Sequence, residues 1–320
     1  MTVSKHISIH YCQLLRFIKH LNGMIVSVII TLASMFPISC SSASDEWDAG
    51  LDNIIDLTQP LRVLVLGNSY STDGLAYMSE LVKGAELNQT QFCIYNGVIS
   101  GGGISEWSDV CSSNQRKSFE RKAGVMSMYS SGKVIDVIRQ DWDVIAIMQS
   151  SDKSYSWTNF EEHIGRFIEL LRQNCTNPNM RLVYVLPWGH TRDTAPKELA
   201  GNLECAQKLV KDYGLDIIPV GVAVQNARNT CLCNETYLTR DNWHLCHGVG
   251  RYVAACTWYE ALLAPLSKVG ILGNPTNHVL SKSEKMDDTS VAVDEVNRAL
   301  CQKCAFYAIQ DKWIVHDDLE

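Results

Sequence analysis

Residues 61–74 read LRVLVLGNSYSTDG, and this stretch decides the fold. Its first part, RVLVL at 62–66, is a short run of β-branched and aliphatic residues, which predicts a strand that is buried on both faces. Gly67 then permits a tight turn, and the polar residues that follow are typical of the beginning of a helix. A buried strand that leads through a turn into a helix is the repeating unit of a parallel α/β sheet.

The same unit recurs along the chain. Four further short apolar runs predict strands, and the stretches between them have apolar residues three and four positions apart, as amphipathic helices do. We therefore expect a three-layer α/β/α domain around a five-stranded parallel sheet. Residues 114–132 are polar and predict a flap over the ligand site, and residues 287–309 predict a C-terminal helix. The further strands are expected at 91–95, 144–148, 181–186 and 215–220, and the other helices at 75–85, 160–173, 196–213 and 248–263.

The composition is that of a globular, acidic protein. The 320 residues are 46% hydrophobic and 20% charged, so the chain can bury a full core, which argues against an intrinsically disordered chain and a disulfide-stapled miniprotein. The formal net charge is −7 and the body holds no run of Lys or Arg, so nucleic acid is not expected as a partner. A small-molecule or polysaccharide ligand fits this composition better.

The first 40 residues are typical of an export signal. They hold three basic residues and no acidic one, and an apolar run occupies positions 24–38. This run is shorter than the roughly 20 residues that a membrane span needs. Ser39 before Cys40 is similar to a bacterial lipoprotein processing site, although Pro37 stands where leucine is usual. The alternative is a plain secretory signal that is cut nearby.

We expect the mature chain to begin at a lipidated Cys40. Residues 41–60 would form an acidic tether, 61–265 the domain that carries the site, and 266–320 a helical extension packed on that domain. Without the three positive charges of residues 1–40, the formal net charge goes from −7 to −10. The expected location is the outer membrane or cell surface of a Gram-negative bacterium, otherwise the periplasm, with the lipid anchor as the contact with the membrane.

Ten cysteines follow the expected signal, and an oxidising compartment permits disulfides. Cys231 and Cys233 with Cys246, or Cys301 with Cys304, have the residue types of zinc ligands, but no second pair stands at the spacing of a zinc finger. We therefore expect buried thiols or one to three disulfides, and no metal site.

Two segments far apart in the chain hold the side chains of a nucleophilic site. Ser69 follows the first strand, at the carboxyl edge of the sheet where ligands of such folds bind. Asp241 and His244 lie on an expected loop, and their spacing lets Asp241 accept a hydrogen bond from Nδ1–H while Nε2 takes a proton from serine. Serine needs this help because its hydroxyl is a weak nucleophile at neutral pH. Alone, each segment has an ordinary reading, an N-cap serine or a solvated loop; together they predict a Ser69–His244–Asp241 triad.

Two further segments at expected strand ends offer donors for the oxyanion of an acyl-transfer intermediate. Glycines at 101–103 let backbone N–H groups approach a ligand closely, although a plain glycine-rich turn reads the same. Gln149, after the third strand, offers a side-chain amide.

In this order the segments resemble the blocks of SGNH, or GDSL-type, hydrolases, over about residues 61–263. LGNSYS at 66–71 is similar to the first block, usually Gly-Asp-Ser-Leu-Ser, with Asn68 in place of Asp and Ser69 as the nucleophile. NGVISG at 96–101 is similar to the second block, whose last glycine, here Gly101, supplies an oxyanion-hole amide besides that of Ser69. DNWH at 241–244 matches the Asp-x-x-His block.

The third block departs from the family. The family has Gly-x-Asn-Asp there, whereas this chain has QSSD at 149–152, without asparagine. We assign the third oxyanion donor to Gln149, with Ser151 as the alternative. The resemblance implies a flavodoxin-like SGNH hydrolase fold and a branch of exported bacterial proteins with a glutamine in this block. The α/β-hydrolase fold is disfavoured because no Gly-x-Ser-x-Gly elbow occurs.

The resemblance also implies a serine esterase that forms an acyl-enzyme and uses no cofactor. An exported protein with aromatic residues near its strand ends suits the removal of acetyl or similar groups from carbohydrate. Trp188, for a sugar face, and His190 are the expected substrate contacts, with ordinary packing as their alternative; Arg251 is expected in a structural ion pair. A lipid esterase or acyltransferase of the same fold is one alternative function, and a non-catalytic glycan-binding protein on a degraded hydrolase scaffold is the other.

Overall fold

The computed structural model describes residues 59–128, 131–286 and 291–319. The expected export signal at 1–40, the lipidation site Cys40 and the tether up to residue 58 lie outside the described residues.

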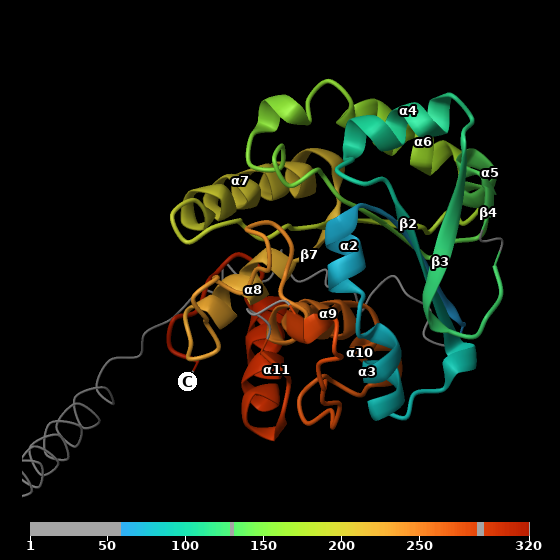
Figure 1. Ribbon diagram of the computed structural model, residues 1–320. Coiled ribbons are helices and arrows are strands. Elements are labelled where there is room, and N and C mark those ends of the chain that lie inside the picture. The colour runs from blue at the N-terminus through green and yellow to red at the C-terminus, as the bar shows by residue number, and fades with distance from the viewer. Residues whose placement is uncertain (1–58, 129–130, 287–290, 320) are drawn as a thin grey trace, which may run out of the picture. The chain divides into compact units, whose positions relative to one another are not determined.

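A mostly parallel sheet forms the middle layer (Figure 1). Its five parallel strands match the five that the sequence predicts, so the three-layer α/β/α class is confirmed. The order across the sheet is β4-β3-β2-β1-β5-β6-β7, so β1, the strand that leads to Ser69, lies in the middle of the sheet. The strands are β1 (Leu61–Gly67), β2 (Phe92–Val98), β3 (Arg116–Gly124), β4 (Ser131–Lys133), β5 (Val144–Ile147), β6 (Arg181–Val185) and β7 (Asp216–Ile218).

The predicted number of strands is wrong, because the described part of the sheet has seven strands rather than five. Residues 114–132, which we expected to be a flap over the site, supply β3 and part of β4, and both strands are antiparallel to their neighbours. Of the nine residues of β3, RKSFERKAG, only Phe119 and Ala123 are buried. A charged strand near a sheet edge lacks the apolar run on which the strand predictions rest.

Helices cover both faces of the sheet (Figure 1). One face carries α4 (Ile104–Ser112), α5 (Val134–Ile138), α6 (Ile164–Asn174) and α7 (Ala195–Tyr213). The other carries α2 (Ser69–Gly74), α3 (Met78–Gly84), α8 (Val220–Arg228), α9 (Val249–Leu262), α10 (Ala264–Ser267) and α11 (Glu295–Gln310). Short 3-10 helices lie at Gln89–Gln91, Trp157–Asn159 and Glu284–Met286.

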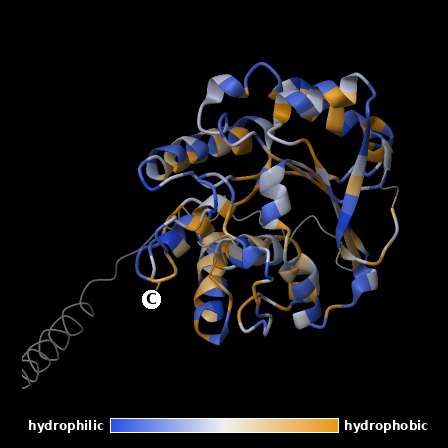
Figure 2. Cartoon of the chain, viewed as in Figure 1, coloured by the Kyte–Doolittle hydropathy of each residue, from blue (hydrophilic) through white to orange (hydrophobic). Residues whose placement is uncertain are grey.

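Helix α9 is buried on nearly all sides, since Arg251 is its only residue that is not buried. The sequence of α9, VGRYVAACTWYEAL, accordingly has no continuous charged face, whereas α7 on the other side of the sheet carries both hydrophilic and hydrophobic residues (Figure 2). Helix α11 packs on it, with Cys301 and Ala305 buried and the side-chain amide of Gln302 donating to the Tyr252 hydroxyl at 3.1 Å. The C-terminal residues therefore contribute to the core of the same domain. Within the described ranges, no helix is both long and apolar enough to cross a membrane.

Candidate active site

Ser69 is the first residue of α2 and follows β1 directly. Asn68 is the N-cap, and its Oδ1 accepts a hydrogen bond from the Tyr70 N–H at 2.9 Å. The amide nitrogen of Asn68 donates to two carbonyl oxygens, those of Gly102 at 2.9 Å and Gln149 at 3.2 Å. One buried side chain thus joins the end of β1 to the loops that follow β2 and β5, which fixes where Ser69 stands.

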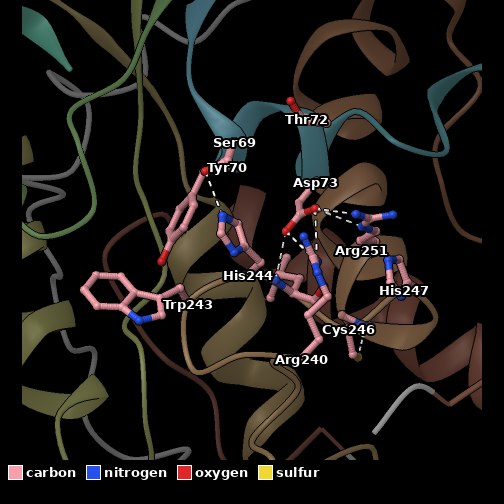
Figure 3. Close-up of polar contacts among 12 residues, drawn as sticks. Ser69, Tyr70, Thr72, Asp73, Arg240, Trp243, His244, Cys246, His247 and Arg251 are labelled. Carbon is pink, nitrogen blue, oxygen red and sulfur yellow. Dashed lines mark hydrogen bonds and ion pairs between the residues drawn. The ribbon is translucent and has the colours of Figure 1, made fainter. Parts of the chain in front are cut away.

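The three side chains of the predicted triad converge. The Nε2 atom of His244 lies 2.9 Å from the Ser69 Oγ, and Nδ1 lies 2.7 Å from the Asp241 Oδ2 (Figure 3 shows the serine–histidine contact). The backbone N–H groups of Trp243 and His244 donate to the other carboxylate oxygen at 3.1 and 2.7 Å. Asp241 therefore both shapes its loop and orients the imidazole, with Nδ1 as donor and Nε2 toward the serine.

The loop that carries Asp241 and His244 is a tight hairpin. Thr239 and Leu245 form an antiparallel bridge, and the N–H of Arg240 donates to the His244 carbonyl at 2.9 Å. Burial raises the pKa of the Asp241 carboxyl, but the hydrogen bonds from His244 and Trp243 outweigh it and hold the pKa below its ordinary value. The carboxylate is therefore ionised at neutral pH and favours a proton on Nδ1.

Two of the predicted oxyanion donors are backbone amides. In the described part of the chain, neither the N–H of Ser69 nor that of Gly101 donates a hydrogen bond. Gly101 has φ +63°, in the left-handed region, and an added Cβ would meet no atom within 4 Å. The position thus favours glycine for its backbone conformation rather than for lack of space.

The loop of glycines at 101–103 is held by a carboxylate and by Gln149. The carboxylate of Glu106 accepts the Gly103 N–H at 2.8 Å and pairs with Lys153 at 3.0 Å, so the loop after β2 is tied to the loop after β5. Although burial raises its pKa, these bonds lower the pKa of Glu106 to about 2. A Cβ on Gly103 would lie 1.9 Å from the Gln149 Oε1, so only glycine fits there.

Gln149 lies at this site, but its side chain is largely used by the protein. Its Oε1 accepts the N–H groups of Ile104 at 3.2 Å and Ser150 at 2.9 Å, and its Nε2 donates to the Asn159 carbonyl at 3.0 Å. One Nε2 hydrogen is outside these bonds, so the role of third donor stays a prediction. Ser151, the alternative donor, lies beside the Tyr70 hydroxyl.

The structure corrects the assignment of Trp188 as a sugar platform. The ring is buried and stacks on Tyr70 with centroids 3.8 Å apart, and its Nε1 donates to the Trp243 carbonyl at 2.9 Å. No face of Trp188 is open to a substrate; it supports the serine helix and the histidine loop instead. Trp243, which directly precedes His244, is exposed instead, with 46% of its surface accessible, and the Asp-x-x-His motif gives no sign of this.

His190 is also buried, and it pairs with a carboxylate. Its Nδ1 lies 3.0 Å from Glu198, which also accepts the His190 backbone N–H at 2.7 Å. The Nε2 atom is buried and makes no hydrogen bond in the described structure. The imidazole packs against the Trp243 ring with centroids 4.3 Å apart. His190 therefore contacts the residue that precedes His244.

A buried ion cluster lies directly beside the triad (Figure 3). Asp73, on α2, accepts hydrogen bonds from the guanidinium groups of Arg240 and Arg251 and from the Leu245 N–H. The sequence predicts an ion pair for Arg251 but does not identify Asp73 or Arg240. The available signal is that Asp73 is one helical turn after Ser69 and shares its helix face.

The described residues include no group of three His, Cys, Asp or Glu side chains that could hold a metal ion. No disulfide joins two of the ten described cysteines, so the alternative of buried thiols fits most of them. Burial raises the pKa of Cys93 to about 11 and of Cys111 to about 12, which makes these two thiols poor nucleophiles.

The fold and the site together define a three-layer α/β protein with a serine–histidine–aspartate cluster at the carboxyl edge of its sheet. The chain belongs to the DUF4886 family, described as a domain of unknown function, whose model matches residues 62–288.

Solved structures that are similar to this chain include the following two. A DUF4886 family protein from Bacteroides uniformis is 23% identical, with a TM-score of 0.66 over 81% of this chain and 98% of that one. A catalytic mutant of an acetylxylan esterase from Geobacillus stearothermophilus is 12% identical, with a TM-score of 0.44 over 64% of this chain and 95% of that one. The first likeness supports the fold. No curated protein matches the chain.

Proposed function

We propose that the protein is a serine esterase. The observation that carries this proposal is the pair of contacts at His244, whose Nε2 lies 2.9 Å from the Ser69 Oγ while its Nδ1 lies 2.7 Å from Asp241. This geometry gives the serine a base and gives the base an orienting carboxylate, which are the requirements of a nucleophilic hydroxyl. A protein that only binds its ligand needs neither.

The reaction follows from these positions. His244 Nε2 takes the Ser69 hydroxyl proton as Oγ bonds to the ester carbonyl carbon, and the amides of Ser69 and Gly101 stabilise the oxyanion, with Gln149 as the proposed third donor. The C–O bond to the leaving group breaks, and the imidazolium gives its proton to the departing alcohol. Water then attacks the acyl-enzyme, loses a proton to His244, and Ser69 regains its proton as the acid leaves. Asp241 stays ionised throughout and stabilises the imidazolium.

The substrate that we propose is an acylated carbohydrate, with acetyl as the acyl group. The support is Trp243, which directly precedes His244 in the chain and whose ring packs against His190 while the residue stays 46% exposed. An exposed aromatic ring is the kind of surface on which a sugar ring can lie. We propose in addition that the protein is exported and attached to the membrane through a lipid on Cys40. This location would give it access to acylated polysaccharides outside the cytoplasm.

The test compares the parent with Ser69→Ala on acetylated polysaccharides and on p-nitrophenyl acetate, with acetate release and dye release as readouts. We expect Ser69→Ala to lose about 10⁴-fold or more in kcat/KM and to lose labelling by a serine-directed fluorophosphonate. Thr72→Ala is the matched control, because it removes a hydroxyl from the same helix.

The possible outcomes separate the parts of the proposal. Equal turnover by parent and Ser69→Ala would disprove the nucleophile. Turnover confined to long acyl chains, or dependent on an added acceptor alcohol, would leave the serine mechanism and replace the carbohydrate substrate. A parent that takes no fluorophosphonate yet is retained on a polysaccharide gel would make the protein a binder.

A further inference from the structure

Helix α2 carries a second functional side chain one turn after the serine. We propose that Asp73 is a positioning residue that sets the separation between Ser69 and His244. This inference rests on the proposed esterase function, and it concerns how the triad is assembled from two parts of the chain that are 175 residues apart.

The two halves of the triad are held to different degrees. Ser69 stands on a helix that is fixed to the sheet, since the Ser71 Oγ lies 2.7 Å from the Asn68 carbonyl oxygen and 2.8 Å from the Asn96 Oδ1 and shares its one proton between them. Asp241 and His244 lie on a hairpin at the surface, where about half of the Asp241 side chain is exposed. The Trp188 ring, which stacks on Tyr70 and donates to the Trp243 carbonyl, is one link between α2 and the hairpin. A direct contact between the two elements would hold the imidazole at bonding distance from the hydroxyl more firmly.

Asp73 provides that contact. Its Oδ2 accepts the Leu245 N–H at 2.9 Å, and Leu245 directly follows His244. Arg240 directly precedes Asp241. Its guanidinium donates to both oxygens of Asp73, at 3.1 and 3.2 Å, and also to the Leu245 carbonyl. Both ends of the Asp241–His244 segment are thus joined to one carboxylate on the serine helix.

The carboxylate is anchored to the core as well. Arg251, on α9, approaches the Asp73 Oδ1 with its Nε at 2.9 Å and its Nη2 at 2.8 Å. Asp73 is 1% exposed, so its charge is acceptable only because these partners surround it. The arrangement joins α2, the hairpin and α9 at a single point next to the triad (Figure 3).

The charge of Asp73 is essential to this arrangement. An asparagine in its place could still accept the Leu245 N–H, but its amide nitrogen would face guanidinium donors, and two half-buried cations would lose their counter-ion. The hairpin would then be released from α2 at both ends. A displacement of about 1 Å at reacting atoms can cost on the order of 10²-fold in rate.

The experiment measures kcat and KM for Asp73→Asn with p-nitrophenyl acetate, below the melting temperature of each variant. We expect kcat and the rate of fluorophosphonate labelling to fall together by about 10²-fold, with KM within about threefold of the parent. Arg240→Lys, which keeps the positive charge but loses the bond to the Leu245 carbonyl, should lose about tenfold and keeps the proposal testable if Asp73→Asn does not fold.

Asp216→Asn is the matched control. It removes the carboxylate partner of a buried arginine, Arg181, at the amino edge of the sheet, so it should lower stability without changing kcat. If the two variants have equal melting temperatures and lose kcat equally, Asp73 affects activity only through stability. An unchanged kcat in Asp73→Asn would overturn the proposal.

A crystal structure of Asp73→Asn separates this inference from the esterase function. The inference expects the Ser69 Oγ and His244 Nε2 to lie beyond hydrogen-bond distance, whereas an unchanged separation of 2.9 Å would refute it. A parent that hydrolyses no ester would disprove the function alone, because the separation in the variant still decides the role of Asp73.

Discussion

Two imidazole–carboxylate pairs lie at the carboxyl edge of the same sheet. His244 pairs with Asp241 at 2.7 Å and His190 with Glu198 at 3.0 Å, in both cases through Nδ1, and in both the carboxylate also accepts the backbone N–H of its histidine. The pairs differ at Nε2, which faces the Ser69 hydroxyl in the first and makes no hydrogen bond in the second.

The two pairs also differ in their access to solvent. The side chains of His244 and Asp241 are 29% and 48% exposed, whereas those of His190 and Glu198 are 9% and 14% exposed. A carboxylate that orients an imidazole is therefore not enough to identify an active site. The combination that distinguishes the first pair is a hydroxyl at Nε2 together with an open approach for the substrate.

The largest test of this comparison is the replacement of each histidine by alanine. His244→Ala removes the base of the proposed mechanism, so kcat/KM should fall by about 10⁴-fold or more, while His190→Ala should keep activity within about tenfold. Ester hydrolysis by both purified variants checks the expectation.

Thermal melting of both variants is the control for folding. His190→Ala leaves the half-buried Glu198 without its partner and should lower the melting temperature more than His244→Ala does. Equal losses of activity in the two variants would show that the comparison misidentifies the base.

Trp243 sharpens the comparison, because it precedes His244 in the chain and packs on His190 in space. Trp243→Ala should raise KM for an acetylated oligosaccharide by about 3- to 10-fold, the worth of one aromatic contact, and leave p-nitrophenyl acetate almost unaffected. Michaelis curves for the two substrates measure the difference.

Trp188→Phe is its control, since phenylalanine still packs on Tyr70 and only the bond to the Trp243 carbonyl is lost. Any effect of this buried change should be the same for both substrates. A sugar-specific effect in Trp188→Phe, with none in Trp243→Ala, would return the platform to Trp188.

The smallest expected effect is on stability as a function of pH. Burial raises the pKa of Glu198 and Asp241, but hydrogen bonds from their histidines and neighbouring groups hold both below the ordinary values. A carboxyl with a lowered pKa adds stability above its unfolded pKa, about 4, and that stability is lost as the pH falls through the folded pKa.

Glu198→Gln should therefore lower the melting temperature at pH 7 by about 3–6 °C, and Asp241→Asn, which is more exposed and better screened, by less than about 2 °C. Both differences from the parent should shrink as the pH approaches 3. A melting difference that grows in acid would contradict the assigned direction of the pKa shifts.

The sequence predicts the parts of the site that follow from strand order. Ser69, Gly101 and Gln149 each lie within three residues of the end of a parallel strand, and parallel strands bring such positions to one edge of the sheet. The spacing of Asp241 and His244 likewise predicts their contact, because both lie on one short loop.

The missed features depend on contacts that no local pattern encodes. Asp73 meets Arg240 and Arg251 across 167 and 178 residues. Trp188 is buried, with Tyr70 stacked on it, whereas Trp243 is exposed, and neither outcome can be read from the residue type. Strand β3 lacks an apolar run because it lies near the sheet edge. Burial and long-range pairing, rather than residue type, decide these cases.

The two bonds that Asn68 donates give a reason for the asparagine in the first block. The carbonyl groups of Gly102 and Gln149 both turn inward at this point and present oxygen lone pairs, which an ionised aspartate would repel. Asparagine and these inward-turned carbonyl groups thus form a matched set of donor and acceptors. Asn68→Asp would set a carboxylate against two carbonyl oxygens, so a single added charge would separate three loops that one amide group now joins.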